Sequence, residues 1–420
     1  ELCFQVREEA LIDLITTLDF RMTYKDSERD IEISGDFPCG SAGQIEKSPD
    51  SETVFVQPKP EIVPDWFYDA LQQNFGGAGV PREYAFHIRI RSKKAQSICI
   101  RFVFTETNGA GYMDPPYWIR RDGEWWQVAG SDTGFEPRQY AEITIRLAAG
   151  EEAQVANKPY PTPDRVYDEI DELVRCHPIL SSTVFGQTAE GRPLVSLETE
   201  PREETLLVNA TMQPAEPAAR PILSIVHWLT DRSDIANRLL ERFQFCFIPL
   251  PNPDGSFHGR SVTNARGEVP MFSFGRHLAG ESAPEETIAF WDYATRIKPA
   301  GHIEFHTHYQ NTRFHKLNPL SLDWFPESMH DRVRETYRCL LRTNSQWRVT
   351  ELAKDTPIVT AGKFVNLATH FQTIGCCYQI YALTEQSTCT QAIAATRALA
   401  EGLAGEDWVS AVSEPEIVKG

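Results

Sequence analysis

The sequence predicts an α/β protein in two parts: an N-terminal antiparallel β-sandwich, then an α/β domain with a mixed central sheet. Apolar and polar residues alternate through about the first 155 positions, as at Phe86, Ile88 and Ile90, which is typical of half-buried strands. A proline-rich stretch covers 156–165, and strand and helix patterns alternate after it. These observations predict a sandwich at 1–157, an α/β domain at 158–405 and a C-terminal tail at 406–420.

Local patterns support both parts. Asp122-Gly123 lies between tryptophan-containing strands and predicts a hairpin turn, and the sandwich also takes strands from the alternation at Ile98–Phe104 and Ile143–Leu147. Asp164 is placed to cap a helix that starts the second part. In the α/β domain we expect strands over 194–199, 205–212, 243–250, 301–306 and 378–384, and helices over 217–230, 284–297, 328–343 and 388–403.

Composition narrows the class of protein. Lys and Arg number 41 against 59 Asp and Glu, so the net charge of −18 argues against nucleic acid as a partner. No run of about 18 apolar residues is present, so no membrane span is expected. Nine cysteines without a Cys-x-x-Cys pair, and an N-terminus without a signal-peptide pattern, predict a cytoplasmic protein with reduced thiols. The sequence carries no signal for a particular oligomeric state.

Polar residues gather at the ends of four predicted strands, where α/β domains usually carry their functional groups. Three histidines within seven residues are the strongest of these signals, because histidine is the commonest metal ligand. The groups are Gln213-Pro-Ala-Glu216; Pro251-Asn-Pro-Asp-Gly255 with Arg260, Asn264 and Arg266 after it; the row His302, Glu304, His306 and His308; and Leu383-Thr-Glu385-Gln.

Each group also has a structural interpretation. Glu216 could simply favour a helix N-terminus, and the Asn-Pro-Asp-Gly run is a good turn sequence. The histidine row could line one solvated edge of a strand, and Glu385 could be a surface charge. Their joint placement favours a functional site over these separate explanations.

Taken in order, the Gln213–Glu216 turn, "IPLPNPDGSFHGR", "IEFHTH" and "YALTEQST" resemble the zinc metallocarboxypeptidase family, its cytosolic branch in particular. The resemblance covers roughly residues 160–400. It implies one zinc ion and a peptide or small amino-acid conjugate as substrate. It also implies that Glu216 and His306 bind the metal, that Glu385 is the general base, and that Gln213 stands where the family has its first histidine ligand.

The chain departs from the family in several places. A neutral amide such as that of Gln213 is a poorer zinc ligand than imidazole, so His308 or His302, or the more distant His227 and His277, are candidate substitutes. The family's Asn-Arg pair, which binds the substrate carboxylate, is replaced by "GEVPMF" after Arg266. Arg260, Arg266 and Asn264 are therefore the candidate substrate-binding residues. The family's active-site tyrosine corresponds to Phe364.

Three hypotheses follow. The first is a divergent metal-dependent hydrolase that cleaves an amide bond with metal-activated water. The second is a catalytically silent pseudo-peptidase that acts as a binding module. The third is an unrelated α/β domain in which the motifs occur by chance.

Overall fold

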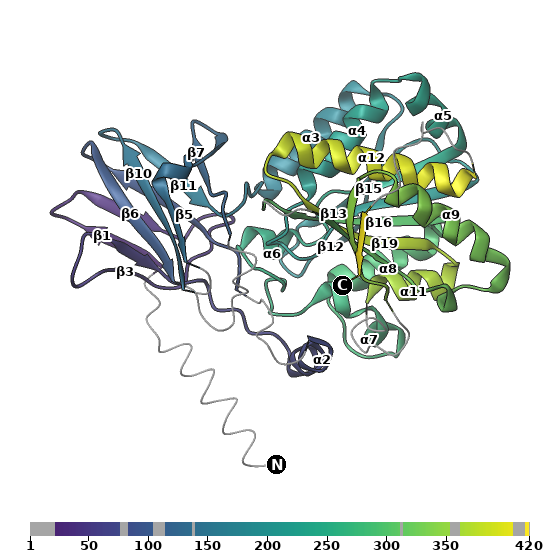
Figure 1. Ribbon diagram of the computed structural model, residues 1–420, viewed down its shortest axis with the longest axis horizontal. Coiled ribbons are helices and arrows are strands. Elements are labelled where there is room, and N and C mark those ends of the chain that lie inside the picture. The colour runs from purple at the N-terminus through teal and green to yellow at the C-terminus, as the bar shows by residue number, and fades with distance from the viewer. Residues whose placement is uncertain are drawn as a thin grey trace, which may run out of the picture.

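The computed structural model describes residues 22–75, 83–103, 114–136, 139–310, 314–352, 362–405 and 416–419. Two bodies lie side by side, a β-sandwich in purple and blue and an α/β domain in teal to yellow (Figure 1). The predicted fold class is confirmed. The domain boundary at residue 157 stays a prediction.

The sandwich consists of two sheets whose facing side chains form its core. Ile88, Ile90, Ile100 and Phe102 are at most 1% exposed, as the alternating pattern predicts, whereas Phe104 lies outside the described residues. Within the sandwich, all described strand pairs are antiparallel except β4 with β6. One sheet has the order β1 (Thr23–Asp26), β2 (Ile31–Ser34), β5 (His87–Ser92), β11 (Glu152–Ala156), β7 (Trp118–Arg121) and β8 (Glu124–Gln127); the other has β3 (Ile45–Lys47), β4 (Val54–Val56), β6 (Gln96–Val103), β10 (Tyr140–Leu147) and β9 (Thr133–Glu136).

The predicted hairpin joins β7 to β8. Its two turn residues, Asp122 and Gly123, both have positive φ angles, 49° and 88°. A turn with this backbone matches the twist of the flanking strands, which explains the Asp-Gly sequence. The turn also contacts the α/β domain, since Arg165 of α3 (Pro163–Cys176) donates to the Gly123 carbonyl at 3.2 Å.

A nine-stranded mixed sheet is the centre of the α/β domain. Its middle strands β15, β14, β16 and β19 are parallel, and antiparallel strands flank them. β16 is buried at every position because it lies in the middle of the sheet. The order is β12 (Ser181–Gln187), β13 (Pro193–Glu198), β15 (Phe243–Ile248), β14 (Glu204–Ala210), β16 (Gly301–His308), β19 (Ile374–Tyr381), β17 (His315–Pro319), β18 (Gln346–Val349) and β20 (Glu416–Lys419).

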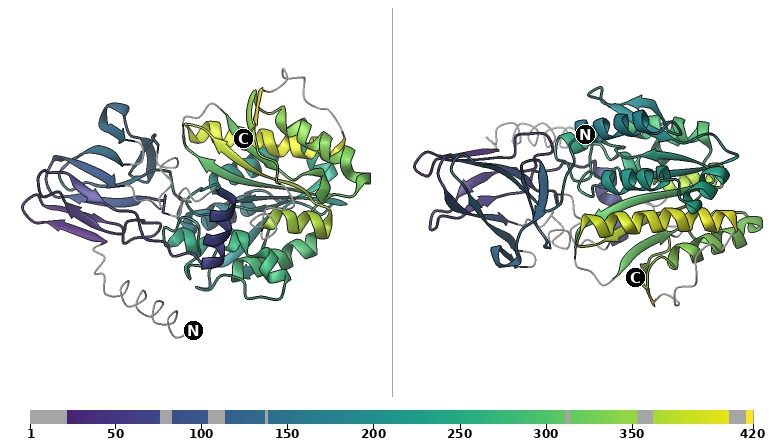
Figure 2. Two further views of the ribbon diagram at one scale, coloured as in Figure 1. Left: turned by 60° about the horizontal axis from the view of Figure 1, so that its bottom comes forward. Right: turned by 90° about the horizontal axis from the view of Figure 1, so that it is seen from above.

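Helices cover both faces of this sheet (Figure 2). α12 packs against α4, α9 and β16, whereas α8 packs against β12 and α11 against β19. Among the described residues no helix is long and apolar enough to cross a bilayer. The helices are α2 (Asp65–Phe75), α3 (Pro163–Cys176), α4 (Ala219–Thr230), α5 (Asp234–Arg242), α6 (Pro253–Phe257), α7 (Phe274–Leu278), α8 (Glu285–Ile297), α9 (His330–Leu341), α11 (Lys363–Phe371) and α12 (Glu385–Ala404).

Three local predictions need correction. Helix α3 begins at Pro163 after Thr162, so Asp164 lies inside its first turn and is not the cap. The last predicted strand ends at Tyr381, and Glu385 is the first residue of α12, because the Thr384 side chain caps that helix. Residues 406–415 of the predicted tail lie outside the described residues, but Glu416–Lys419 pairs with β18 as a strand.

Glu61 fastens the sandwich side of the molecule to a loop of the α/β domain. Its carboxylate is 4% exposed and accepts backbone N–H groups from Ser261 (2.6 Å), Val262 (2.8 Å) and Thr263. Three successive N–H groups form a concave binding place for an anion. Glu61 thus fixes the loop that follows Arg260.

Replacing Glu61 by alanine leaves three buried backbone N–H groups without their acceptor. We expect Glu61→Ala to lower the free energy of unfolding by about 1–3 kcal/mol, because a buried donor without an acceptor keeps its desolvation cost. Urea unfolding at pH 7 measures this. Glu46→Ala, on the exposed face of β3, is the control and should have little effect; equal stability of the two variants would contradict the role given to Glu61.

Candidate active site

The Gln213–Glu216 turn follows directly from β14. The Thr211 hydroxyl accepts the backbone N–H of Gln213 at 3.0 Å, and the N–H of Glu216 reaches back to the Gln213 carbonyl at 3.0 Å. The chain therefore turns sharply at the carboxyl end of the strand. This turn directs Glu216 inward, where it is 4% exposed.

Hydrogen-bond donors surround the Glu216 carboxylate. The Tyr84 hydroxyl donates to Oε1 at 3.0 Å, His306 Nδ1 contacts Oε2, and His308 Nε2 lies 3.5 Å from Oε2. Burial alone would raise the pKa of Glu216, but His308, His306 and Lys158 outweigh burial and hold that pKa well below its usual range. The structure therefore brings together two residues predicted as metal ligands, with a candidate substitute beside them.

The histidine row of β16 is a buried polar chain. His306 Nε2 lies 2.9 Å from Glu304 Oε1, and Glu304 also accepts from Asn209 (2.9 Å) and Lys363. His302 Nε2 lies 2.6 Å from Asn209 Oδ1, beyond Glu304 and away from Glu216. The alternative of a solvated strand edge is wrong, since all of β16 is buried.

Charges in this chain are arranged in alternation. Burial opposes the ionised form of Glu304, but Lys363 and His306 outweigh burial and lower its pKa to about 2. Burial likewise disfavours a charged His306, yet Cys377 and Glu216 hold the pKa of His306 well above its ordinary value. Each charged group thus has a partner of opposite sign, which is the condition for burying charge.

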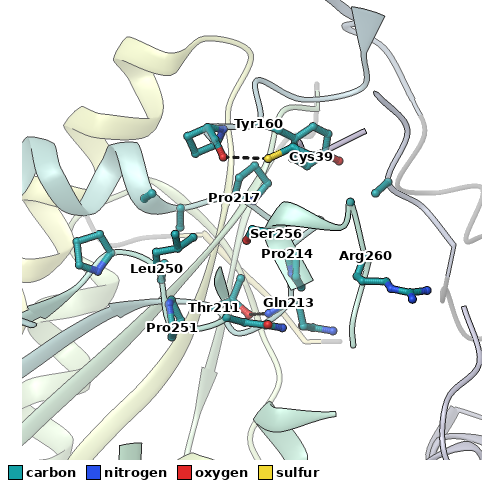
Figure 3. A pocket seen from close by; sticks show the side chains of 18 residues that line it. Cys39, Tyr160, Thr211, Gln213, Pro214, Pro217, Leu250, Pro251, Ser256 and Arg260 are labelled. Atoms are coloured by element: carbon teal, nitrogen blue, oxygen red, sulfur yellow. Dashed lines mark hydrogen bonds between the residues drawn. The ribbon is translucent and has the colours of Figure 1, made fainter. Parts of the chain in front are cut away.

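Gln213 lies beside Glu216 in sequence but lines a separate small cavity of about 30 Å³. Figure 3 shows it near Thr211 and Pro214, whereas the Arg260 side chain extends away from this group. Cys39 and Tyr160 close the cavity from the sandwich side and the linker. A cavity of this size holds water rather than a substrate.

Glu385 lies in a neighbouring pocket and not beside Glu216. Its carboxylate is 3.2 Å from Arg220 Nε, and Tyr309 lines the same pocket. Pro217 and Ala219 line both pockets, so the two are adjacent. The predicted general base is therefore adjacent to the cavity of Gln213, and its ion pair is with Arg220 and not with a residue around Glu216.

The remaining predicted residues have structural partners. Asn264 is buried and donates to Glu268 (2.9 Å) and Glu286 (3.1 Å), and Arg266 pairs with Glu285 at 2.8 Å. These contacts tie the loop to the start of α8. The structure does not place Asn264 or Arg266 beside Glu216.

The Asn-Pro-Asp-Gly run serves mainly as a turn. The Asn252 side chain accepts the N–H of Gly255 at 2.9 Å and caps α6. Asp254 is fully buried and binds Arg192 (2.6 Å) and Thr188 (2.8 Å). The interpretation of the Asn-Pro-Asp-Gly run as a turn therefore accounts for these contacts.

Three other predicted positions are remote from the Glu216 carboxylate contacts. Phe364 packs 5.2 Å from the His302 ring and has no hydroxyl to contribute. His227 lies on the exposed side of α4, 3.3 Å from Glu169. His277 lies in the last turn of α7.

The residues around Glu216 fit a zinc ion in kind but not in position. One carboxylate and two imidazoles, Glu216, His306 and His308, form a known set of catalytic zinc ligands. Yet both ring nitrogens of His306 face carboxylates, and a zinc-bound imidazole has one nitrogen on the metal. Among the described side chains no three His, Cys, Asp or Glu are arranged to hold a metal.

Sequence reasoning missed Tyr84, Lys158 and Lys363. Lys158 is 1% exposed and donates to the Ala215 carbonyl at 2.6 Å, next to Glu216. Lys363 is completely buried against Glu304. These residues lie in a loop, a linker and a helix start, and no local pattern marks them as site residues.

The fold and the sequence both match the metallocarboxypeptidases. Residues 166–281 match the family model described as zinc carboxypeptidase, while no curated protein matches the chain. A metallo-carboxypeptidase from Burkholderia cenocepacia has a similar structure, with a TM-score of 0.71, 16% identity and coverage of 89% of this chain and 99% of that one. A metallo-carboxypeptidase from Pseudomonas aeruginosa, in complex with (2-guanidinoethylmercapto)succinic acid, gives 0.69, 14%, 88% and 99%.

The fold is thus that of the metallocarboxypeptidases, and the resemblance inferred from the motifs is confirmed. A chance occurrence of the motifs in an unrelated α/β domain is excluded. The solved structures show the fold, and the family model links residues 166–281 to the zinc carboxypeptidases. The role of each site residue stays a prediction.

Stability should depend on pH through Glu286, which Asn264 contacts. Burial raises the pKa of this carboxyl from 4.5 to about 7. The folded state therefore holds the proton more tightly than the unfolded state, so stability is full below pH 4.5 and is lost as pH rises to about 7. We expect Glu286→Gln to be more stable than the natural chain at pH 8, by on the order of 3 kcal/mol, and similar to it at pH 4.5.

Chemical unfolding at the two pH values measures this difference. Glu285→Gln, at the neighbouring and more exposed carboxylate, is the matched control and should follow the natural chain at both pH values. A parallel response of Glu286→Gln and the natural chain at both pH values would contradict the assignment.

Proposed function

We propose that this protein is a divergent hydrolase of the metallocarboxypeptidase type that cleaves an amide bond. One observation carries the proposal: Glu216 and His306 come from motifs 90 residues apart and meet in a buried contact. They meet at the carboxyl ends of the parallel strands β14 and β16, where such folds place their reactive groups. The family match over residues 166–281 supports it.

Zinc is the proposed cofactor, with Glu216, His306 and His308 as the residues that would hold it. Binding would require the direct contact between His306 Nδ1 and Glu216 to part, and a bound ion would then supply Lewis acidity toward water and an amide carbonyl. Within the chain, Tyr84 orients the Glu216 carboxylate and Glu304 orients His306 through Nε2. Such outer contacts fix the direction of a ligand.

Glu385 is the proposed general base. The Arg220 guanidinium lies 3.2 Å from its carboxylate and fixes the direction of that side chain. Glu385 also lines the pocket at the start of α4. Its ion pair with Arg220 would have to yield to substrate, so Arg220 is a positioning residue in this proposal.

The substrate is proposed to be a peptide or a small amino-acid conjugate. The Asn-Arg pair of the family is missing, and Asn264 and Arg266 are held by other side chains. This favours a substrate without the usual free terminal carboxylate. The cytoplasmic location suggested by the cysteine usage stays a prediction.

Metal content and activity test the proposal together. We expect protein purified without chelator to contain stoichiometric zinc and to hydrolyse members of an N-acyl amino-acid amide panel, and His306→Gln to lose both. Gln213→His should leave zinc affinity unchanged, because Gln213 lines a cavity to which Glu216 and His306 do not contribute. Elemental analysis and mass spectrometry of the products measure these outcomes.

The control is His370→Gln, at a helix end remote from Glu216. Circular dichroism of His306→Gln separates loss of ligand from loss of fold. A folded natural chain that takes up no zinc and hydrolyses no amide would contradict the proposal.

A second candidate function, a silent binding module, is favoured by Lys158. This buried ammonium lies next to Glu216, and burial lowers its pKa to about 8 despite the attraction of Glu216. A cation of the protein itself then supplies positive charge where the family has a metal. Such a site would be charge-balanced without zinc.

Lys158→Met separates the two functions, because it removes the charge and keeps most of the apolar stem. If the protein is a silent module, the natural chain binds no zinc and Lys158→Met gains measurable zinc binding at Glu216. If it is a hydrolase, zinc is already bound and Lys158→Met changes its affinity little. Titration with zinc and a competing chelator measures the affinity, with the exposed Lys94→Met as control.

A further inference from the structure

A second charged pocket lies between the two domains, and Glu216 and His306 are not among the described residues that line it. Residues of the β7–β8 hairpin line it on one side, and residues at the starts of α3, α4 and α12 line it on the other. Its volume of about 280 Å³ is near the lower end for ligand pockets, roughly 300–1,000 Å³. A pocket of this size suits a small molecule and not a folded partner.

Both signs of charge line this pocket. The helix side supplies Arg220 and Arg165 together with the two carboxylates that Arg220 contacts, and the hairpin supplies Glu124. Arg165 also donates to the Gly123 carbonyl of the hairpin at 3.2 Å. Arg220 contacts Glu169 through Nη1 (3.0 Å) and Glu385 through Nε (3.2 Å), and its side chain is still 54% exposed. The guanidinium is therefore held in place by two carboxylates and open to a third.

The helix wall also favours an anion through its backbone. Three helices, α3, α4 and α12, begin at this pocket, and each helix start carries partial positive charge. Neither Thr162 before α3 nor Ala218 before α4 caps its helix with a side-chain hydrogen bond. Together with two guanidinium groups, this makes the helix wall the place for a carboxylate.

The hairpin wall offers complementary contacts. Glu124 is exposed and lies beside Trp125, whose ring is partly buried. Tyr309, Val166 and Leu223 supply further aromatic and apolar surface. An ammonium group is favoured near Glu124, and an apolar side chain is favoured against the rings.

We propose that this pocket binds a free α-amino acid, with its carboxylate on Arg220 and Arg165, its ammonium at Glu124 and its side chain on Trp125 and Tyr309. The incoming carboxylate competes with Glu385 and Glu169 for the Arg220 guanidinium. Ligand binding therefore loosens the ion pair that holds Glu385. The proposal needs no metal and holds for a hydrolase and for a binding module alike.

Three probes, of which two each lack one charged group of L-phenylalanine, test where the carboxylate and the ammonium bind. Isothermal titration of the full chain compares L-phenylalanine with N-acetyl-L-phenylalanine, which lacks the ammonium, and L-phenylalaninamide, which lacks the carboxylate. We expect L-phenylalanine to bind tightest, and each blocked probe to bind roughly 10-fold more weakly, since each loses one charged hydrogen bond.

Two variants test which residue binds the carboxylate and which binds the ammonium. Arg220→Gln should remove the preference for L-phenylalanine over its amide, and Glu124→Gln should remove the preference over the N-acetyl probe. Arg334→Gln, in an exposed ion pair on α9 outside this pocket, is the matched control and should change nothing. Both test residues are largely exposed, so the variants are expected to fold.

Equal affinity of the three probes, no binding of any probe, or unchanged preferences in Arg220→Gln would overturn the proposal. The readout is binding, so these results would leave the amide-hydrolase proposal untouched. Conversely, absence of zinc and of hydrolysis would leave the binding result untouched.

Discussion

The contact between His306 and Glu216 is the constraint on which the centre of the molecule depends. A buried carboxylate is costly unless opposite charge and hydrogen-bond donors surround it. The chain meets this requirement from three places: the Tyr84 hydroxyl donates a hydrogen bond, Lys158 in the linker supplies nearby positive charge, and the imidazoles of β16 contact the carboxylate. One acidic side chain thereby unites segments far apart in the sequence.

The same requirement extends along β16. Once His306 carries charge between Glu216 and Glu304, Glu304 in turn needs a cation, and Lys363 at the start of α11 supplies it. Asn209 completes the chain, because it donates to the Glu304 carboxylate through Nδ2 and contacts His302 through Oδ1. A strand at the middle of a sheet is normally apolar. Burying this polar row costs folding free energy, and a functional role explains that cost best.

Much of the fold could be predicted from the sequence because its signals are local. Alternation at Ile88 and Ile90 and the Asp-Gly turn indicate the sandwich, and their outcome depends on few distant contacts. The sequence predicts that the last strand extends to residue 384, whereas it ends at Tyr381. Thr384 has a side chain typical of strands, but here it caps α12 by accepting the Ser387 N–H.

The site was only partly predictable for a different reason. Glu216 and His306 follow strands, and strand order brings them together, so motif spacing predicts their contact. Lys158, Tyr84 and Arg220 act through tertiary contacts that no spacing encodes. Asn264 and Arg266 matched a role by position, but side chains of α8 hold them elsewhere.

Lys158 also has a consequence for motion. The proline-rich linker looks like a hinge, yet its lysine is buried against the Ala215 carbonyl beside a charged carboxylate. Rotation of the sandwich about this linker would draw both Lys158 and Tyr84 away from Glu216 and leave that charge uncompensated in the interior. The two domains should therefore move as one body, and any opening between them is energetically coupled to the protonation or ligation of a single glutamate.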